Sequence, residues 1–206
     1  MRVLVACEYS GRVRDAFIAH GHDALSCDLL PSEAKGPHYQ GDVLDILGDG
    51  WDLMVAHPPC TDLSSSGALY WQNKEVRQLE ALRFVRALMD APIPYICIEN
   101  PVGIIATMIR PPDQVVQPYW FGDPISKRTC LWLKNLLPLV PTQRVEPEWV
   151  LNKQGETYID RKGKRYSRWH YKTGRGNGHV RSLTPLGLAH AMAEQWSQPA
   201  VYCFAV

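Results

Sequence analysis

Cys60 is the residue of this sequence best placed for covalent chemistry. It comes shortly after the apolar run 52–56, which is typical of a buried strand in a parallel sheet. Pro58 and Pro59 fix the backbone between that strand and Cys60, and the serine-rich loop 61–67 follows. Open α/β sheets bind ligands at the carboxyl ends of their strands, so a thiolate here would be a nucleophile. The alternative is a small buried apolar residue, the usual role of cysteine.

A carboxyl group ends the next apolar strand in the same way. The run 95–98 leads directly into Glu99-Asn100-Pro101. Because the proline fixes this exit as well, we interpret Glu99 as a functional acid rather than a surface or helix-capping residue. The sequence therefore predicts a nucleophile and an acid at the carboxyl ends of two strands.

The beginning of the chain has the pattern of a cofactor-binding unit. A strand at 2–6, a turn that ends at Gly11 and a helix after it are typical of a nucleotide-type α/β unit, although the glycine fingerprint is incomplete. The second strand, 24–27, ends at Asp28. A carboxylate at that position is placed to accept hydrogen bonds from ribose hydroxyls.

The remaining pattern predicts an α/β fold: a mostly parallel twisted sheet with helices on both faces and an antiparallel edge pair at 117–122 and 127–133. An amphipathic helix is expected over 74–90, with its apolar side formed by Val76, Leu79, Leu82, Phe84, Val85 and Leu88. Shorter helices are expected at 44–47, at 103–108 and from Thr184 onward.

Composition describes an ordinary globular protein. The 206 residues suffice for one sizeable core, with 46% hydrophobic and 21% charged residues. No apolar run approaches the roughly 20 residues of a membrane span, and the amino terminus does not resemble a signal peptide. Six cysteines occur without a CxxC or CxxH pair, which argues against a zinc site or a disulfide framework. We expect a cytoplasmic protein without metal or membrane partner, and a monomer or weak dimer.

Basic residues are concentrated in the segment 151–181. It holds nine lysines and arginines against two acids, a net charge of +7, whereas the rest of the chain carries −6. Aromatic residues between such charges are typical of contact with nucleic acid; a solvated loop, with Trp169 in a small core of its own, is the alternative. With Ser64 of the loop after Cys60, the expected nucleic-acid contacts are Arg161, Lys162, Lys164, Arg165, Arg168, Trp169, Lys172 and Arg175.

These motifs, in this order, resemble those of the cytosine C5 DNA methyltransferase family. Pro58-Pro59-Cys60 is identical to the nucleophile motif of that family, and Glu99-Asn100-Pro101 is similar to its Glu-Asn-Val. The turn 5–11 lies where the family has its glycine-rich cofactor turn. Further matches are 41–43 to its adenine-contacting Gly-Asp segment, 122–129 to its Gly-x-Pro-Gln-x-Arg-x-Arg, and 176–180 to its closing Gly-Asn-x-Val.

The resemblance implies a Rossmann-like methyltransferase fold that transfers a methyl group from S-adenosylmethionine to C5 of cytosine in DNA. The thiolate of Cys60 would add to C6 of a flipped-out base, and Glu99 would act as general acid at N3. Lys127 or Arg128 would hold O2 of the base or a phosphate. The cofactor would be bound by Cys7, Glu8, Tyr9, Ser10, Gly11, Asp28, Asp42, Val43, Pro58 and Asn177.

The expected organisation is a catalytic domain at 1–137, a short basic target-recognition insertion at 138–178, and a C-terminal helical segment at 179–206 that packs back on the catalytic domain. The insertion is far shorter than that of the family. Glu8 and Ser10 stand where the family has glycines, and Ile125 replaces its glutamine. The implied context is DNA modification, as in restriction-modification, in a prokaryotic or phage-infected cell.

Three other interpretations stay open. Adenine-N6 and cytosine-N4 methyltransferases share the fold and a Pro-Pro, but they place an aromatic residue where Cys60 stands. The same C5 chemistry on a free deoxycytidine nucleotide or on RNA is the second, and the +7 segment argues against a mononucleotide. A catalytically silent nucleic-acid-binding module is the third, and the presence of both Cys60 and Glu99 argues against it.

Overall fold

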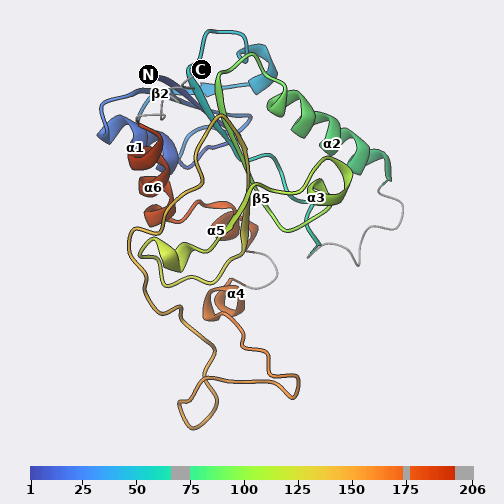
Figure 1. The fold of residues 1–206 in the computed structure, drawn as a ribbon, viewed down its shortest axis with the longest axis vertical. Helices are drawn as coiled ribbons and strands as arrows, with labels where there is room; N and C mark the ends of the chain where they lie inside the picture. The colour runs from blue at the N-terminus through green and yellow to red at the C-terminus, as the bar shows by residue number, and fades with distance from the viewer. Residues whose placement is uncertain (66–74, 174–176, 198–206) are drawn as a thin grey trace, which may run out of the picture.

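The computed structural model describes residues 1–65, 75–173 and 177–197. Its centre is a seven-stranded sheet in the order β3-β2-β1-β4-β5-β7-β6 (Figure 1). The strands are β1 (Arg2–Ala6), β2 (Asp23–Asp28), β3 (His38–Gln40), β4 (Leu53–Ala56), β5 (Tyr95–Pro101), β6 (Gln114–Val116) and β7 (Thr129–Lys134). Strands β1 to β5 are parallel, and β7 is antiparallel to both β5 and β6.

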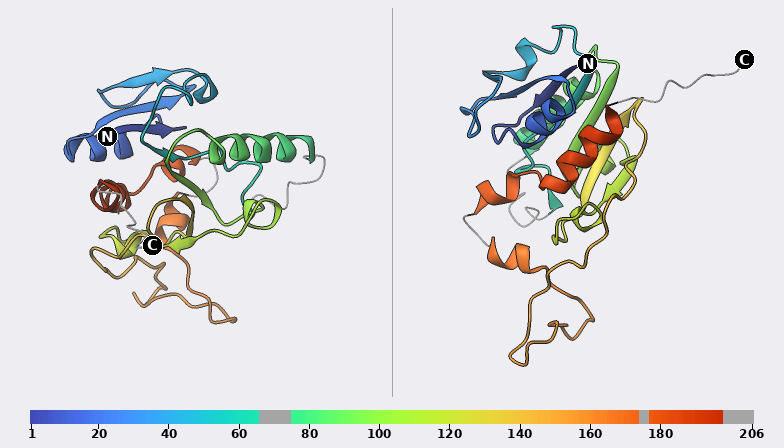
Figure 2. Two further views of the ribbon diagram at one scale, coloured as in Figure 1. Left: turned by 45° about the horizontal axis from the view of Figure 1, so that its top comes forward. Right: turned by 90° about the vertical axis from the view of Figure 1, so that its left-hand side faces the viewer.

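Helices cover both faces of this sheet. On one face, α1 (Arg12–Ala19) and α6 (Leu186–Trp196) pack together against β1, β4 and β5. On the other face, α2 (Glu75–Met89) and α3 (Ile105–Met108) form a second apolar core with the same strands. The left view of Figure 2 shows α1 and α6 on one side of the sheet and α2 on the other. Because apolar side chains on both faces are buried, the central strands read as continuous apolar runs in the sequence.

The order of the strands defines the edge at which a ligand binds. The chain proceeds from β1 through β2 to β3 in one direction, then crosses back to place β4 on the other side of β1. Such a switch point opens a crevice at the carboxyl ends of the two strands. The Rossmann-like α/β fold, with its antiparallel edge pair and helices on both faces, is thus confirmed.

Two expectations about local structure were wrong. The strand expected at 117–122 is a 3-10 helix, η3 (Pro118–Trp120), and the strand that pairs with β7 lies just before it. Proline has no N–H for a sheet ladder but fits the first turn of a helix. In α2 the apolar stripe is buried only from Leu82 onward, since Val76 is 70% and Leu79 50% exposed. The short helix expected at 44–47 is a single 3-10 turn, η1 (Val43–Asp45). The strand β3 was not predicted, because three residues are too few to show a periodicity.

The basic segment forms an arm, residues 148–173, that extends away from the sheet at the bottom of Figure 1. Two successive hairpins make up the arm, with bridges between Leu151 and Thr157 and between Ile159 and Arg165. A third bridge, from Trp149 to Ser167, closes its base, and α4 (Arg168–Lys172) leads the chain back to α5 (Gly178–Ser182).

Both hairpin loops have the same construction. The side-chain oxygens of Asn152 and Asp160 each accept two backbone N–H bonds, at 2.8–3.0 Å. Gly155 and Gly163 follow with φ of +81° and +77°, the left-handed conformation that glycine adopts without strain. This is a turn with a bulge, common in short hairpins, and it fixes the loops that display the basic side chains.

Candidate active site

Hydrogen bonds from β1 and β5 hold the residues that lead into Cys60. The N–H of His57 donates to Ala6 O at 2.9 Å, which continues the β1–β4 ladder beyond β4. The buried Asn100 of β5 donates from Nδ2 to Pro58 O at 2.7 Å. The backbone carbonyl of Cys60 accepts the N–H of Ser64 at 2.9 Å, so the chain turns sharply and leaves the cysteine exposed. The two prolines and Asn100 together fix the position of the thiol.

The loop after Cys60 is joined to the loop after β5. Ser65 N–H donates to Val102 O at 3.0 Å, and Ile104 N–H donates to Leu63 O at 2.9 Å. Gly103 lies between them, where a Cβ would come within 2.0 Å of Leu63 O. Only glycine permits this approach, which brings the two strand exits together. The expected closing loop, 61–67, lies partly outside the described residues, because 66 and 67 are not described.

The charge of Glu99 acts on Cys60, and Glu99 also has a hydrogen-bond partner. Its Oε2 lies 3.0 Å from Nδ1 of His57, and its side chain is only 13% exposed. Burial acts to raise the pKa of Glu99, but the hydrogen bond from His57 and the positive charge of Lys127 outweigh burial and lower that pKa below its usual value. Glu99 is therefore a carboxylate in the free protein at neutral pH.

Of the two cations predicted here, Lys127 acts on the site and Arg128 does not. The ammonium of Lys127 donates to Arg181 O at 3.1 Å and lies 5.6 Å from the centre of the Trp169 ring. Its charge lowers the pKa of both Cys60 and Glu99. The neighbouring Arg128 is exposed and acts on the pKa of Cys130 instead.

The thiol of Cys60 is protonated in the free protein. Desolvation by the surrounding loops raises its pKa even though the residue is exposed at its surface, and the charge of Glu99 raises it further. The opposing charges of Lys127 and Arg181 do not cancel these two effects. Activation of the nucleophile therefore requires a change in the site, such as the arrival of a substrate that accepts a proton.

We expect alkylation of Cys60 by iodoacetamide to be slow at neutral pH and to accelerate at a pH above the usual cysteine range. The reactive species is the thiolate, and a raised pKa makes it scarce. Lys127→Gln removes a favourable charge and should slow the reaction further, with Lys127→Arg as the matched control. The measurement is the pH dependence of modification at Cys60, followed by peptide mass spectrometry. A free-enzyme inflection below pH 8 would contradict this assignment.

The turn after β1 has no room for a phosphate. The carboxylate of Glu8 is buried, and it accepts the N–H of Val13 at 2.8 Å, the N–H of Arg14 at 3.3 Å and the hydroxyl of Ser10 at 3.0 Å. These N–H groups form the amino end of α1, where dinucleotides place their pyrophosphate. Glu8 supplies that negative charge from within the protein. The turn thus favours a cofactor without phosphate, bound through the backbone of Glu8 and its neighbours.

Two acids lie next to this turn. Asp28 at the end of β2 and Asp42 before η1 both raise the pKa of Cys7, adding to the larger effect of burial. Asp28 and Asp42 also bind backbone N–H groups two residues further on, at 3.0 Å each, which fixes their orientation. Fixed carboxylates at this edge suit the hydroxyls of a ribose and a positively charged group.

A small cavity of about 60 Å³ lies between this turn and α5. Tyr9 closes it, because its hydroxyl lies 2.9 Å from Nδ1 of His179 and 3.1 Å from Oγ of Ser182. The cavity is lined by Cys7, Glu8, Tyr9, Ser10, His57, Ser182, Leu183 and Thr184. Its volume is well below the roughly 300 Å³ at which ligand pockets begin. It suits one end of a cofactor, with the remainder along Asp28 and Asp42.

The other predicted cofactor residues are dispersed around this edge. Gly11 adopts φ +76° at the start of α1, and a Cβ there would come within 2.9 Å of Ala34. Val43 and Pro58 are buried, whereas Asn177 is exposed at the start of α5. Val43 packs in the core beneath the site.

The predicted nucleic-acid residues divide into three groups. Arg161, Lys162, Lys164 and Arg165 are exposed on the second hairpin, with Lys164 over the Tyr166 ring and Arg165 over the Trp149 ring. On α4, Arg168 and Lys172 lie 3.9 Å from Glu148, and Trp169 contacts Lys127, so α4 connects the arm to the active site. Ser64, in the loop after Cys60, is buried. Arg175 lies outside the described residues.

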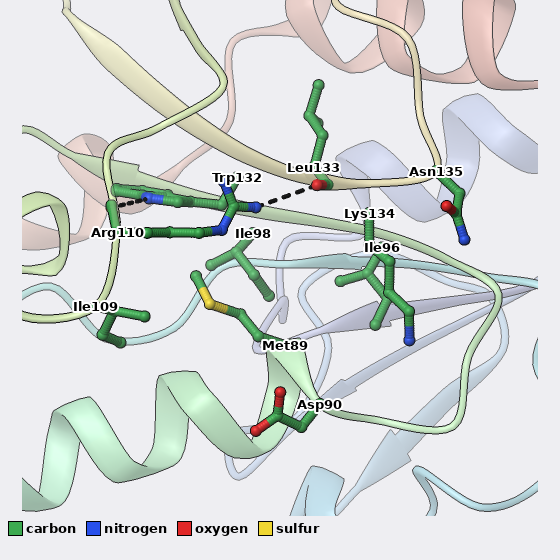
Figure 3. Close-up of a pocket in the computed structure, with 10 residues that line it drawn as sticks. All are labelled: Met89, Asp90, Ile96, Ile98, Ile109, Arg110, Trp132, Leu133, Lys134 and Asn135. Carbon is green, nitrogen blue, oxygen red and sulfur yellow. Dashed lines mark hydrogen bonds between the residues drawn. The ribbon is translucent and has the colours of Figure 1, made fainter.

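A second, larger cavity of about 660 Å³ lies elsewhere (Figure 3). It lies between the end of α2 and the amino-terminal half of β5, where Met89, Ile98 and Trp132 form its walls. Both of its cations have partners within the protein: Arg110 donates to Leu133 O and to Asp113, and Lys134 donates to Ala91 O. None of the predicted site residues lines it.

Sequence reasoning assigned no role to His57, Asn100 or Arg181. Each of them contacts a predicted residue or acts on its pKa. The position of His57 directly after a strand, in the same stretch as Cys60, was a usable signal. No sequence signal indicates Arg181, because its proximity to Cys60 depends on the position of α5 in the folded chain.

Within the part of the chain described, no helix combines the length and apolar character that a membrane crossing requires. Among the same residues, no cluster of three or more His, Cys, Asp or Glu side chains is arranged to hold a metal ion.

No protein-family model matches this chain, and no curated protein matches it. Solved structures do resemble it. A candidate DNA modification methyltransferase encoded within an E. coli prophage is 14% identical, with a TM-score of 0.47 over 71% of this chain and 52% of that one. A mutant of DNMT2 from Spodoptera frugiperda is 16% identical, with a TM-score of 0.43 over 78% and 61%. The chain thus spans less than two thirds of either protein, and such distant likeness assigns no activity.

Proposed function

We propose that this protein is a DNA (cytosine-5-)-methyltransferase that acts through a covalent Cys60 adduct. The observation that carries the proposal is the cluster of a thiol, a carboxylate and an ammonium at the carboxyl edge of β4 and β5, held by the Asn100 and Gly103 contacts. A cofactor turn without a phosphate site lies beside it. In this proposal Cys60 is the nucleophile and Glu99 carries a proton. The positive charge of Lys127 stabilises the negatively charged forms of both side chains.

The protonation states of the free site fit this reaction. Sγ of Cys60 forms a bond to C6 of cytosine and loses its proton, while N3 of the base gains one; Glu99, a carboxylate at rest, is the carrier between them. The addition leaves an electron pair at C5 that would form the new carbon–carbon bond to the methyl group, while the S–CH3 bond of the sulfonium donor would break and leave a neutral thioether. Afterwards the C5 proton leaves to water and the Sγ–C6 bond breaks. The proton on N3 then returns to Cys60.

S-adenosylmethionine supplies the electrophilic methyl group, and the residues of the β1 turn fit it. It carries no phosphate, in keeping with the occupied amino end of α1. Asp28 and Asp42 would hold its ribose and offset its positive charge. The backbone from Cys7 to Gly11, with Tyr9 and Asn177 above it, would hold the amino-acid end.

The arm supports DNA as the substrate. We propose that 1–137 is the catalytic domain, that the insertion 138–178 contacts DNA, and that 179–206 is a C-terminal helical segment that packs back on the catalytic domain. A β-hairpin is narrow enough to enter a major groove, and its exposed cations suit the phosphates. Such an enzyme would modify DNA in the cytoplasm of a prokaryotic or phage-infected cell.

Reversing the charge of Arg161 and Lys162 together should lower DNA affinity at least about tenfold. The slope of log K against the logarithm of the salt concentration should become shallower by about two. These two side chains are exposed at the hairpin tip, where the backbone N–H of Lys162 donates to Asp160. The control is Arg77→Glu with Arg83→Glu on the exposed side of α2, which changes the net charge equally. Fluorescence anisotropy over a salt series measures both quantities. Equal losses in the two variants would mean that net charge, and not the arm, determines binding.

The activity itself is tested by incubating the protein with labelled S-adenosylmethionine and duplex DNA, single-stranded DNA, RNA or dCMP. Nucleoside mass spectrometry then identifies the product. We expect 5-methyldeoxycytidine in DNA. Methylation of dCMP or RNA alone would change the substrate, N4-methyldeoxycytidine or N6-methyldeoxyadenosine would change the chemistry, and cofactor binding without any product would indicate a silent module.

A further inference from the structure

His57 joins the two halves of the site. It follows β4 directly, and its backbone N–H is fixed by Ala6 of β1. Its side chain is 9% exposed, with Nδ1 at 3.0 Å from Oε2 of Glu99. The same side chain lines the small cavity beside Cys7 and Tyr9. One imidazole therefore touches the carboxylate that serves the base and the space that suits one end of the methyl donor.

The two ring nitrogens have different partners. Glu99 is a carboxylate, which only accepts hydrogen bonds, so Nδ1 of His57 carries the proton and donates it. In the neutral ring Nε2 is then an acceptor. Nε2 is buried and has no hydrogen-bond partner among the described residues. A buried polar atom without a partner is costly, which indicates that a ligand or a water completes the site.

We propose that His57 is a bifunctional residue: Nδ1 positions Glu99 for the base, and Nε2 accepts a hydrogen bond from the bound methyl donor. The proposal rests on the proposed function. The ammonium and ribose hydroxyls of S-adenosylmethionine are the donor groups that Nε2 suits. Oε2 of Glu99 accepts the hydrogen bond from Nδ1 of His57. The other carboxylate oxygen of Glu99 can therefore contact the substrate. The donor and the catalytic carboxylate are thereby connected through one rigid ring.

Three substitutions separate the two roles. His57→Asn places an amide nitrogen near the position of Nδ1 and leaves nothing at Nε2. His57→Gln reaches the position of Nε2 and gives up the bond to Glu99. His57→Phe fills the space of the ring and removes both. Thermal unfolding of each variant shows whether the fold is retained.

Cofactor binding and methyl transfer are measured separately. Calorimetric titration with S-adenosylmethionine, without DNA, should show affinity about tenfold weaker for His57→Asn and His57→Phe and near wild type for His57→Gln, the effect of one hydrogen bond. Single-turnover methylation at saturating cofactor should be slowed about 30-fold for His57→Gln and His57→Phe, but only a few-fold for His57→Asn. A purely structural histidine would not produce this crossed pattern.

Each other result is decisive. Equal cofactor affinity in all variants would assign Nε2 to a water and overturn the link to the methyl donor. Equal methylation rates would overturn the positioning of Glu99. If the wild-type protein binds S-adenosylmethionine but methylates nothing, the proposed function fails, while the titrations still decide the contact at Nε2. If it does not bind this cofactor, both proposals fail.

Discussion

Cys60→Ala is expected to abolish methyl transfer, with a loss on the order of 10,000-fold or more, while DNA affinity stays within about twofold. The thiol makes the bond to C6, and no other described cysteine is both exposed and close to Glu99. Cys27, Cys97 and Cys130 are buried, Cys7 is partly buried in the β1 turn, and burial raises the pKa of all four. The effect is the largest that we expect from any single substitution.

Radiolabel transfer to duplex DNA and fluorescence anisotropy measure the two quantities on the same preparation. Cys60→Ser is the matched variant, since a hydroxyl of nearly equal size should be almost as inactive as alanine. Because the residue is exposed, the free energy of unfolding should change by no more than about 0.5 kcal/mol. Activity in Cys60→Ala within tenfold of wild type would exclude the covalent route.

Glu99→Gln should have the second largest effect, slowing methyl transfer by roughly 100- to 10,000-fold. Glutamine keeps an oxygen for His57 but carries no proton to N3. The same substitution removes a negative charge that raises the pKa of Cys60, so alkylation of the thiol should become faster at neutral pH. A variant with a more reactive thiol in the free protein and slower catalysis would assign Glu99 to proton transfer in the substrate complex, and not to activation of the thiol before the substrate binds.

Both readouts come from one protein sample, with Glu75→Gln on the exposed surface of α2 as the control for a lost charge. Unfolding temperatures exclude a loosened fold as the cause of faster alkylation. If Glu99→Gln slows alkylation as well as methylation, Glu99 activates the thiol already in the free protein, and the assigned direction of its effect on the pKa of Cys60 is wrong.

The fold was predictable because the strands and their exits are marked locally. The apolar runs before Cys60 and Glu99 required burial on both faces, and the prolines showed where each strand ends. The order of the strands then placed both residues at one edge. The strand wrongly predicted around Pro118 shows the limit of this approach, because aromatic residues beside a proline are compatible with a helical turn as well as with a strand.

The pairing of side chains was not predictable in the same way. Lys127 and Arg128 are adjacent cations before β7, and only the three-dimensional path of the chain shows that Lys127 is the one beside Cys60. His57 could have faced either side of the sheet edge. Its contact with Glu99 depends on the β4–β5 register, which periodicity does not specify.

The central claim is the covalent adduct, and duplex DNA containing 5-fluorodeoxycytidine tests it most directly. Fluorine at C5 cannot leave as a proton does, so the adduct persists once the methyl group has been transferred. With S-adenosylmethionine present, we predict a one-to-one complex that survives denaturation and maps by peptide mass spectrometry to Cys60, with none in Cys60→Ala. Methylation of ordinary DNA without such a complex, or a complex at another cysteine, would contradict the mechanism.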